Sequence, residues 1–382
     1  MIKPPRLMMT TGPVEVSPRV LSALSRRVIH HSRPEFRNMY DDLLGDLQRI
    51  WKSRNDMIVL HGEGILGIEA SIASMIDRGE EVIIASPGVF GYWFKQIIEA
   101  HEGVPMIVSS DPAKEADIEA FKAAIDEHSD AALVIGVHCE TVSSVVNPIA
   151  EICKISRKAG IPILVDVIAS VGGQETPTDV WKADLCVGSS QHCLSCPPGL
   201  SQISVSPEAW ERMRRKKRPV RNSYLSILDM QETWTKGKYF PYTPLVSEVY
   251  ALSEACKEIL EEGLENVFTR HHDAAEASRR GVEGMGLRLF PVDSRYAADV
   301  VTTFRIPENM HEERLLDDIA MKHGILLAGG FRELKGKVIR IGHSGYSATV
   351  PNVIASLAAL ETEFRTQGFR CEPGSAVKAA LE

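Results

Sequence analysis

Several features that would assign the chain to a class at once are scarce or missing in its 382 residues. No stretch approaches the roughly 20 consecutive apolar residues that a membrane-spanning helix needs. Residues 1–13 show neither the apolar core nor the cleavage site of a signal peptide. The 7 cysteines are odd in number and irregularly spaced, which disfavours a disulfide framework and favours a reducing compartment. We therefore expect a cytoplasmic protein.

Positive charge and aromatic residues are also limited. The formal net charge is −8 and only 6% of the residues are aromatic, a balance that does not favour binding to nucleic acid or to anionic membranes. The one basic run, at residues 212–221, has no interleaved aromatic side chains and is typical of a solvated helix end. We therefore expect small-molecule partners, and neither nucleic acid nor a membrane.

The chain does contain an alternation of short apolar runs with amphipathic, helix-like stretches. Most of the runs are continuous and rich in β-branched residues, which is typical of strands buried on both faces of a sheet. The alternation predicts an α/β fold with a mostly parallel seven-stranded sheet, in which ligands bind beyond the carboxyl ends of the strands. The runs lie at residues 57–60, 82–85, 106–108, 133–137, 163–167, 185–187 and 201–205.

The pattern changes near residue 248, where long helical stretches replace the alternation. Two later strand signals, at residues 300–304 and 338–341, indicate a smaller α+β domain. The tail after Thr366 is expected to be poorly anchored. We predict an N-terminal arm, a large cofactor-binding domain and a small C-terminal domain, with boundaries at residues 1–18, 19–255 and 256–382.

Residues 184–200, DLCVGSSQHCLSCPPGL, form the most distinctive stretch. A short apolar strand ends at a Gly-Ser-Ser triplet and a rigid Cys-Pro-Pro-Gly turn follows, so the segment is suited to holding Gln191 and His192 at a strand end. The stretch resembles the lysine loop of the class V aminotransferases, a branch of the fold-type-I pyridoxal phosphate enzymes that includes alanine–glyoxylate and serine–pyruvate aminotransferases. In that family the residue after the glutamine is the lysine that forms a Schiff base, and here it is His192.

Other segments resemble the same family in the same order and together span residues 5–365. The resemblance implies the fold-type-I architecture and a bound ring that is pyridoxal 5′-phosphate, or free pyridoxal or pyridoxamine. It also implies a homodimer with shared active sites, or a dimer of such dimers, in which the segment with Phe240 and Thr243 reaches the neighbouring site. The implied cofactor-binding residues are Glu63, Gly64, Ile65, Phe90, Thr141, Asp166, Ile168, Gln191, Phe240 and Thr243, and the substrate-binding residue is Arg340.

Two charged residues on apolar runs agree with the implied roles. Asp166 follows a buried strand, where a carboxylate is costly unless a cation or a strong donor meets it, and a protonated pyridine nitrogen would be such a donor. Arg340 lies inside the strand signal at 338–341, and its planar guanidinium suits a substrate carboxylate. Read without the resemblance, Asp166 is better explained as a capping residue, and Arg340 can be explained as half of an internal ion pair.

Glu63 stands just before a predicted helix at residues 65–75, where backbone amides and glycines can form a cup for a phosphate. A carboxylate about 4 Å from a negative charge opposes it by about 4 kcal/mol at an effective dielectric near 20. One interpretation is that Glu63 points outward and only favours the helix dipole. The other is that the cup holds an unphosphorylated ring, as in the branch of the family that uses free pyridoxamine and pyruvate, which this chain resembles in further segments.

His192 leaves three interpretations open. Histidine forms no stable imine with an aldehyde, but with a pKa near 6.5 it can act as a general base. The chain is then an aminotransferase frame with lost or impaired activity, an enzyme of the dehydratase type that starts from an amine cofactor, or a catalytically silent cofactor-binding protein. The predicted activity is amino transfer between a small amino acid such as alanine, or pyridoxamine, and a 2-oxo acid such as pyruvate or glyoxylate.

The spacing from His192 and Cys193 to Cys196 also fits a metal or redox motif. However, the sequence has no second Cys-x-x-Cys to complete a zinc site. The prolines that follow Cys196 provide no helix to lower a thiol pKa. We therefore predict no metal site.

Overall fold

The computed structural model describes residues 6–86 and 88–382, so the first residues of the predicted arm lie outside the described part. All seven predicted strands are present and form one sheet in the order β2-β10-β9-β8-β5-β3-β4. Neighbouring strands are parallel except at β10, which is antiparallel to both β2 and β9. The strands are β2 (Asp56–His61), β3 (Glu81–Ala85), β4 (Val104–Ile107), β5 (Leu133–Val137), β8 (Ile163–Asp166), β9 (Leu185–Ser189) and β10 (Leu200–Val205).

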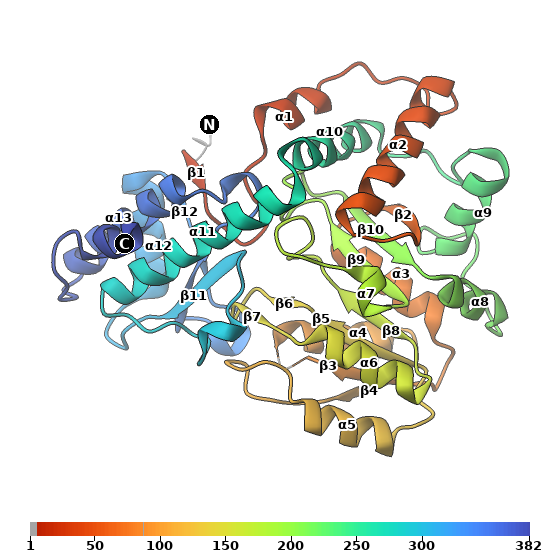
Figure 1. Ribbon diagram of the computed structural model, residues 1–382, viewed down its shortest axis with the longest axis horizontal. Helices are drawn as coiled ribbons and strands as arrows, with labels where there is room; N and C mark the ends of the chain where they lie inside the picture. Colours follow the sequence, from red (N-terminus) through yellow and green to blue (C-terminus); the bar gives the residue numbers. More distant parts are fainter. Residues whose placement is uncertain (1–5, 87) are drawn as a thin grey trace.

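Helices cover both faces of this sheet (Figure 1). Every residue of the central strands β5, β8 and β9 is buried, which explains why their sequences are continuous apolar runs rather than alternating ones. The helices of this part are α1 (Pro18–Leu24), α2 (Pro34–Ile50), α3 (Gly64–Met75), α4 (Val89–Ala100), α5 (Ile118–Glu127), α6 (Ile149–Ala159), α7 (Thr178–Trp181), α8 (Pro207–Arg215) and α9 (Ile227–Gly237).

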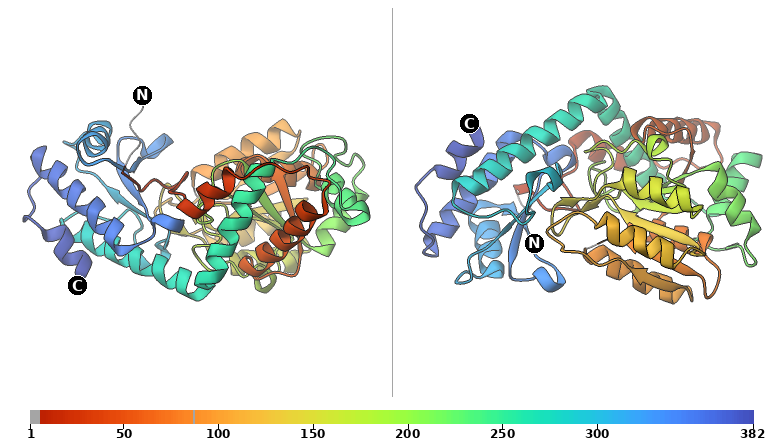
Figure 2. Two further views of the ribbon diagram at one scale, coloured as in Figure 1. Left: turned by 90° about the horizontal axis from the view of Figure 1, so that it is seen from above. Right: turned by 60° about the horizontal axis from the view of Figure 1, so that its bottom comes forward.

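A second apolar core lies beyond two long helices. Helix α10 (Val246–Glu262) packs against α1 and α2, and α11 (Leu264–Gly284) continues from it along the other half of the molecule (Figure 2). There β11 (Val301–Arg305), β14 (Val338–Gly342) and β13 (Ala328–Gly329) form an antiparallel sheet. Phe304, Ile341 and Leu360 belong to the core between this sheet and the helices α12 (Glu312–Asp318) and α13 (Val350–Thr366).

The described part of the N-terminal arm pairs with the C-terminal half of the molecule before the chain enters the half that contains the seven-stranded sheet. Strand β1 (Leu7–Met8) pairs in parallel with β12 (Ile325–Leu326). The amide of Gly342 donates to the carbonyl oxygen of Met9 at 2.8 Å. The arm therefore passes between the two halves, and the next residues, Thr11 and Gly12, enter the cavity described below.

The expectation of a poorly anchored tail is wrong. Residues after Thr366 include a further helix, α14 (Ser375–Leu381), which packs against α11 and α13. The Glu361 carboxylate accepts from the amides of Gly374 at 2.5 Å and Ala376 at 2.9 Å. A side chain on Gly284 would lie 2.5 Å from the Ala379 Cβ, so small residues allow close helix packing that a reading of the tail by itself could not reveal.

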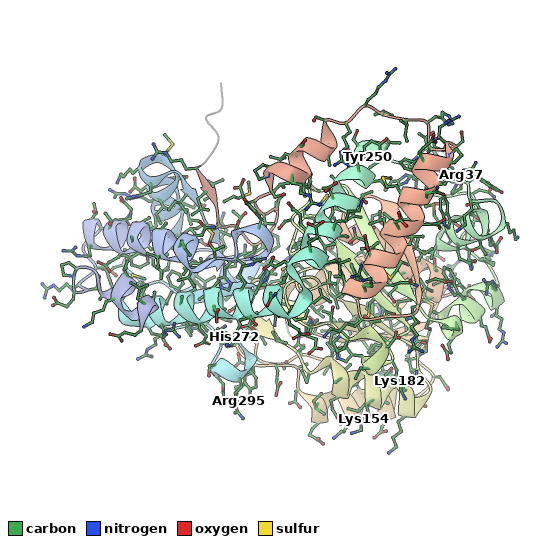
Figure 3. All side chains as sticks on the ribbon, turned by 45° about the horizontal axis from the view of Figure 1, so that its top comes forward. Arg37, Lys154, Lys182, Tyr250, His272 and Arg295 are labelled. Atoms are coloured by element: carbon green, nitrogen blue, oxygen red, sulfur yellow. The ribbon has the colours of Figure 1, made fainter. Side chains whose placement is uncertain are left out.

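Exposed basic side chains occur on both halves of the molecule. The exposed side chains of Lys154, Lys182 and Arg295 lie at the outer edge of the molecule (Figure 3). Within the basic run of residues 212–221, Arg221 forms ion pairs of 2.9 Å with Asp229 and 2.8 Å with Glu232. The described residues contain no helix that is both long and apolar enough to cross a membrane.

Candidate active site

A cavity of about 340 Å³ lies at the carboxyl ends of the parallel strands, where ligands of α/β sheets bind. Segments that follow β2, β5, β8 and β9 form one side of the cavity. The C-terminal half of the molecule contributes Phe331 and Arg340 to the cavity lining. The structure thus brings together residues from distant parts of the chain. Of the predicted site residues, it places at this cavity Glu63, Ile65, Phe90, Thr141, Asp166, Ile168, Gln191, His192 and Arg340.

Asp166 lies in this cavity lining at the end of β8 and is almost fully buried. Its carboxylate accepts from the Ile168 amide at 2.8 Å. Burial raises the pKa of Asp166 to about 7, the Ile168 amide opposes this shift, and the charge of Glu63 adds to it. A carboxylate in this state favours a cationic or strongly donating partner, because such a partner would offset the cost of burying its charge.

Glu63 points into the cavity, which excludes the interpretation that it faces outward. Its carboxylate accepts from Gln191 Nε2 at 3.1 Å. The Gln191 amide oxygen accepts in turn from the Ser189 hydroxyl, and that hydroxyl accepts from the Gly64 amide at 3.0 Å. Glu63 is the N-cap residue of α3, so a network of side chains and one backbone amide holds its negative charge at the helix end.

Gly64 does not line the cavity but sets its shape. A Cβ at Gly64 would approach the Ile168 Cδ1 atom to 2.5 Å and the Ser189 Cβ to 3.0 Å. Any side chain at this position would displace Ile168, which lines the cavity. Glycine is therefore required for the close approach of α3 to the loop after β8.

His192 lines the same cavity on a firmly held loop. The Val14 amide of the arm donates to the Gln191 carbonyl at 3.2 Å, and the Ser195 amide donates to the His192 carbonyl at 2.8 Å. The imidazole Nδ1 is buried and has no hydrogen-bond partner among the described residues. Burial lowers the pKa of His192 to about 4, with the Thr11 backbone opposing the shift, so the ring is neutral at neutral pH.

Arg340 is the cation of the cavity lining. Its Nε donates to the Gly329 carbonyl at 2.6 Å, and Nη1 donates to Thr11 Oγ1 at 3.2 Å and to the Thr141 carbonyl at 3.4 Å. Burial lowers the pKa of Arg340 to about 10, so it keeps its charge at neutral pH. All three acceptors are neutral, and the guanidinium therefore suits an incoming carboxylate.

Two lining aromatics had no predicted role in the site. Trp93 of α4 lies edge-to-face with Phe90, at a centroid distance of 5.7 Å, and Phe331 lies edge-to-face with Trp93, also at 5.7 Å. Only the spacing of Phe90 and Trp93, one helical turn apart, indicates in the sequence that these two rings share a face. Phe331 comes from a distant loop, so its contact with Trp93 depends on the tertiary fold.

The two residues predicted to act in a neighbouring subunit do not line the cavity of their own chain. Phe240 is buried and packs against Tyr40 and Trp234, with ring centroids 4.8 Å and 4.9 Å away. Thr243 is exposed. The described residues contain no group of three or more His, Cys, Asp or Glu side chains arranged to hold a metal ion, and burial raises the pKa of Cys193 to about 12.

Comparison with known proteins accounts for this arrangement. The sequence model of the family "Aminotransferase class-V" matches residues 21–338. The chain belongs to the class-V aminotransferases. Pyridoxamine–pyruvate transaminase of Mesorhizobium japonicum is 34% identical to it over 385 residues, covering 99% of this chain and 96% of the relative.

Two solved structures of other aminotransferases resemble the present chain over nearly its whole length. The pyridoxamine–pyruvate aminotransferase of Mesorhizobium loti superposes with a TM-score of 0.94 at 33% identity, covering 99% of this chain and 97% of the other. The ureidoglycine–glyoxylate aminotransferase of Bacillus subtilis superposes with a TM-score of 0.96 at 32% identity, covering 100% and 98%. The predicted aminotransferase family and fold are therefore confirmed, together with a ring of the pyridoxal type, whether phosphorylated or free.

The cavity of this class-V aminotransferase fits a pyridoxal ring. Asp166 offers a buried carboxylate with a raised pKa, which a ring N–H would satisfy, and such a contact keeps the ring an acceptor for the electrons of a substrate carbon. Ile168 and Phe90 offer apolar surfaces beside it. No lysine is among the residues that line this cavity, so the lining residues supply no primary amine to hold an aldehyde covalently.

Proposed function

We propose that this protein transfers an amino group from unphosphorylated pyridoxamine to a 2-oxo acid of the pyruvate or glyoxylate type. The products are pyridoxal and the matching amino acid, alanine in the case of pyruvate, and the reverse transfer uses the same residues. Asp166 holds the ring nitrogen, Phe90 and Ile168 pack on the ring, and Arg340 takes the carboxylate of the acid. Thr141 and Gln191 orient the ring from its edge.

The observation that carries this proposal is the position of Glu63. Backbone amides at the start of α3 would favour a phosphate, but the Glu63 carboxylate stands at that helix end and is held by Gln191 at 3.1 Å. A phosphate dianion there would meet an anion, at a cost on the order of 4 kcal/mol. A neutral hydroxymethyl group would instead donate a hydrogen bond to the same carboxylate. A relative whose name states pyridoxamine as a substrate supports this choice.

His192 has a defined task in this proposal. Because the amine arrives on the substrate, the cavity needs no lysine to supply it, and what remains for the protein is to move a proton between the ring's C4′ carbon and the α-carbon of the acid. The His192 imidazole is neutral at neutral pH, since burial lowers its pKa to about 4, and its Nδ1 has no partner among the described residues. A positioned base of this kind contributes roughly 10²- to 10⁴-fold.

Ring affinities test the proposal. We expect calorimetric titration to show tighter binding of pyridoxamine than of pyridoxamine phosphate. Glu63→Gln removes the negative charge and is expected to shift the ratio of the two affinities toward the phosphorylated ring by at least about 10-fold, since 1.4 kcal/mol corresponds to that factor. The matched control is Glu69→Gln, in the same helix, where the carboxylate pairs with His101 at 3.2 Å away from the cavity lining. Tighter binding of the phosphorylated ring by the unaltered protein would contradict the proposal.

We also propose that two copies of the chain associate as a homodimer with shared sites. Tyr239 and Leu245 are exposed large side chains on the segment that contains Thr243, and Tyr224, which precedes α9, is also exposed. Tyr224 stacks on Tyr242 with a centroid distance of 4.5 Å. An exposed group of this kind is typical of an interface. Sedimentation analysis of the unaltered protein and of Leu245→Lys would test the assembly.

The remaining proposals concern compartment and domains. All seven cysteines are free, and six of them are buried, which supports a reducing compartment such as the cytoplasm. The two apolar cores support a division near residue 255. Limited proteolysis with mass spectrometry would locate the boundary, and fractionation of the source cells would test the compartment.

A further inference from the structure

The outer wall of the cavity is an aromatic array. Phe90 and Trp93 come from α4, and Phe331 comes from the loop after β13. Successive rings meet at 78° in each pair, the edge-to-face arrangement that aromatic rings prefer. All three line the cavity. Phe331 remains 41% exposed, so this wall extends from the inner cavity to its mouth.

The backbone that carries Phe331 is fixed rather than free to move. The Gly330 amide donates to the Glu312 carboxylate, and the Leu334 amide donates to the Phe331 carbonyl at 3.1 Å. A side chain at Gly330 would collide with the Leu334 carbonyl oxygen. The neighbouring Arg332 guanidinium lies over the Tyr92 ring, 5.8 Å from its centroid. The wall is therefore a preformed surface against which a substrate can pack.

Arg340 lies close to this wall in the fold. Its Nε donates at 2.6 Å to the carbonyl of Gly329, which is the last residue of β13 and lies two residues before Phe331. An acid whose α-carboxylate binds Arg340 would therefore lie in the same cavity as the rings of this wall. The remaining charged side chains of the lining, Glu63 and Asp166, are both acidic. The lining thus offers no second cation for a second carboxylate.

We propose that Trp93 and Phe331 determine specificity among the 2-oxo acids and amino acids, by favouring apolar side chains larger than the methyl group of pyruvate, which remains a slower substrate. This inference rests on the proposed function, because it assigns the side-chain subsite of the same acid. An apolar side chain gains contact with the two rings, and one methylene is worth roughly 10-fold or more in a hydrophobic pocket. A side-chain carboxylate would lose its hydration against the same rings without a partner, so acids with two carboxylates are rejected.

The first test compares acids with pyridoxamine as the common amine donor. We expect kcat/KM for 4-methyl-2-oxopentanoate and phenylpyruvate to exceed that for pyruvate by at least about 10-fold. Turnover of 2-oxoglutarate is expected to be lower than that of pyruvate. Equal values for all four acids, or a preference for 2-oxoglutarate, would overturn the proposal.

Variants of Phe331 test whether the aromatic wall causes the preference for larger apolar acids. Phe331→Ala is expected to lower the ratio of kcat/KM for 4-methyl-2-oxopentanoate to that for pyruvate by at least about 10-fold. Phe331→Arg is expected to raise the value for 2-oxoglutarate and lower it for 4-methyl-2-oxopentanoate. Val180→Ala, on α7 and 76% exposed, is the control and should leave all ratios unchanged. If Phe331→Arg left the ranking of the acids unaltered, Phe331 would have no part in selection.

A binding experiment separates this proposal from the proposed function. Calorimetry with the unreactive acids 4-methylpentanoate, propionate and glutarate measures the subsite without any turnover. We expect 4-methylpentanoate to bind at least about 10-fold more tightly than propionate, and Phe331→Ala to remove the difference. If this holds while no acid is turned over, the subsite is correct and amino transfer is not the reaction. If amino transfer occurs but the difference is absent, the specificity proposal alone fails.

Discussion

Gly12 of the N-terminal arm lies directly against the imidazole ring of His192. A Cβ at Gly12 would come within 2.7 Å of Nδ1 and 2.9 Å of Nε2 and still closer to Cε1. Gly12 also has a φ of +147°, a backbone conformation that side chains disfavour. The arm and the loop after β9 are therefore fitted to each other, and the position of the imidazole depends on a residue 180 positions away in the sequence.

Gly12→Ala is expected to displace the His192 ring and to reduce turnover by at least about 10-fold, because small displacements of a proton-transfer group are costly. The strained φ should also lower the free energy of unfolding by about 1–3 kcal/mol. Steady-state kinetics and urea unfolding measure the two effects. Gly286→Ala is the control, with φ +81° but nothing within 4 Å of an added Cβ: it should lose stability and keep its activity. Full activity in Gly12→Ala would refute the packing argument.

Substitutions at His192 separate its roles in binding and in proton transfer. His192→Ala should still bind pyridoxamine but should slow amino transfer by about 10²- to 10⁴-fold, the usual contribution of a general base. His192→Lys places a primary amine in the cavity and should form an imine with pyridoxal. Borohydride followed by mass spectrometry should then find a pyridoxyl adduct on residue 192 of the variant and none on the unaltered protein. Unchanged turnover in His192→Ala would show that the proton moves by another route.

Asp166 makes the stability of the ring-free protein depend on pH. Burial raises the pKa of its carboxyl to about 7, so the folded state binds this proton more tightly than the unfolded chain does. The stabilisation is complete below about pH 4, the pKa of an unfolded Asp, and is lost as the pH rises through 7. Asp166→Asn removes the titrating carboxyl, and the variant should show a weaker decline between about pH 4 and 7.

Urea midpoints at several pH values measure this difference for the ring-free protein. Glu140, whose pKa burial also raises to about 7, adds its own decline in both proteins. The charge of Asp166 contributes to that raised pKa, so Asp166→Asn removes the decline due to Asp166 and reduces the decline due to Glu140. Adding pyridoxamine should abolish part of the decline in the unaltered protein alone, because the ring nitrogen then meets the ionised carboxylate. Identical pH profiles for the two proteins would contradict the assigned burial effect.

Much of the large sheet could be predicted from its sequence. The continuous apolar runs carry their own signal because strands covered on both faces need apolar residues throughout, and the residues after them meet at one edge of the sheet. Asp166 and His192 belong to this group. The resemblance to a family, rather than the runs themselves, supplied their expected chemistry.

The remaining features depend on contacts between distant segments. The direction of Glu63 is set by Gln191 at 3.1 Å, and no local pattern near residue 63 contains that information. Phe331 reaches the cavity only because a separate sheet carries its loop to α4. The C-terminal helix was missed for the same reason, since its small residues are recognisable as a packing surface only beside the glycines of α11.

The measurement that tests the central claim most directly is a product assay with pyridoxamine and pyruvate. The purified protein is incubated with both compounds, and pyridoxal is measured by absorbance and alanine by mass spectrometry. We predict equal amounts of the two products, in molar excess over the protein, with His192→Ala reduced by the factor given above. Tight binding of pyridoxamine without formation of alanine would contradict the account and would identify the protein as a binder of the ring rather than an aminotransferase.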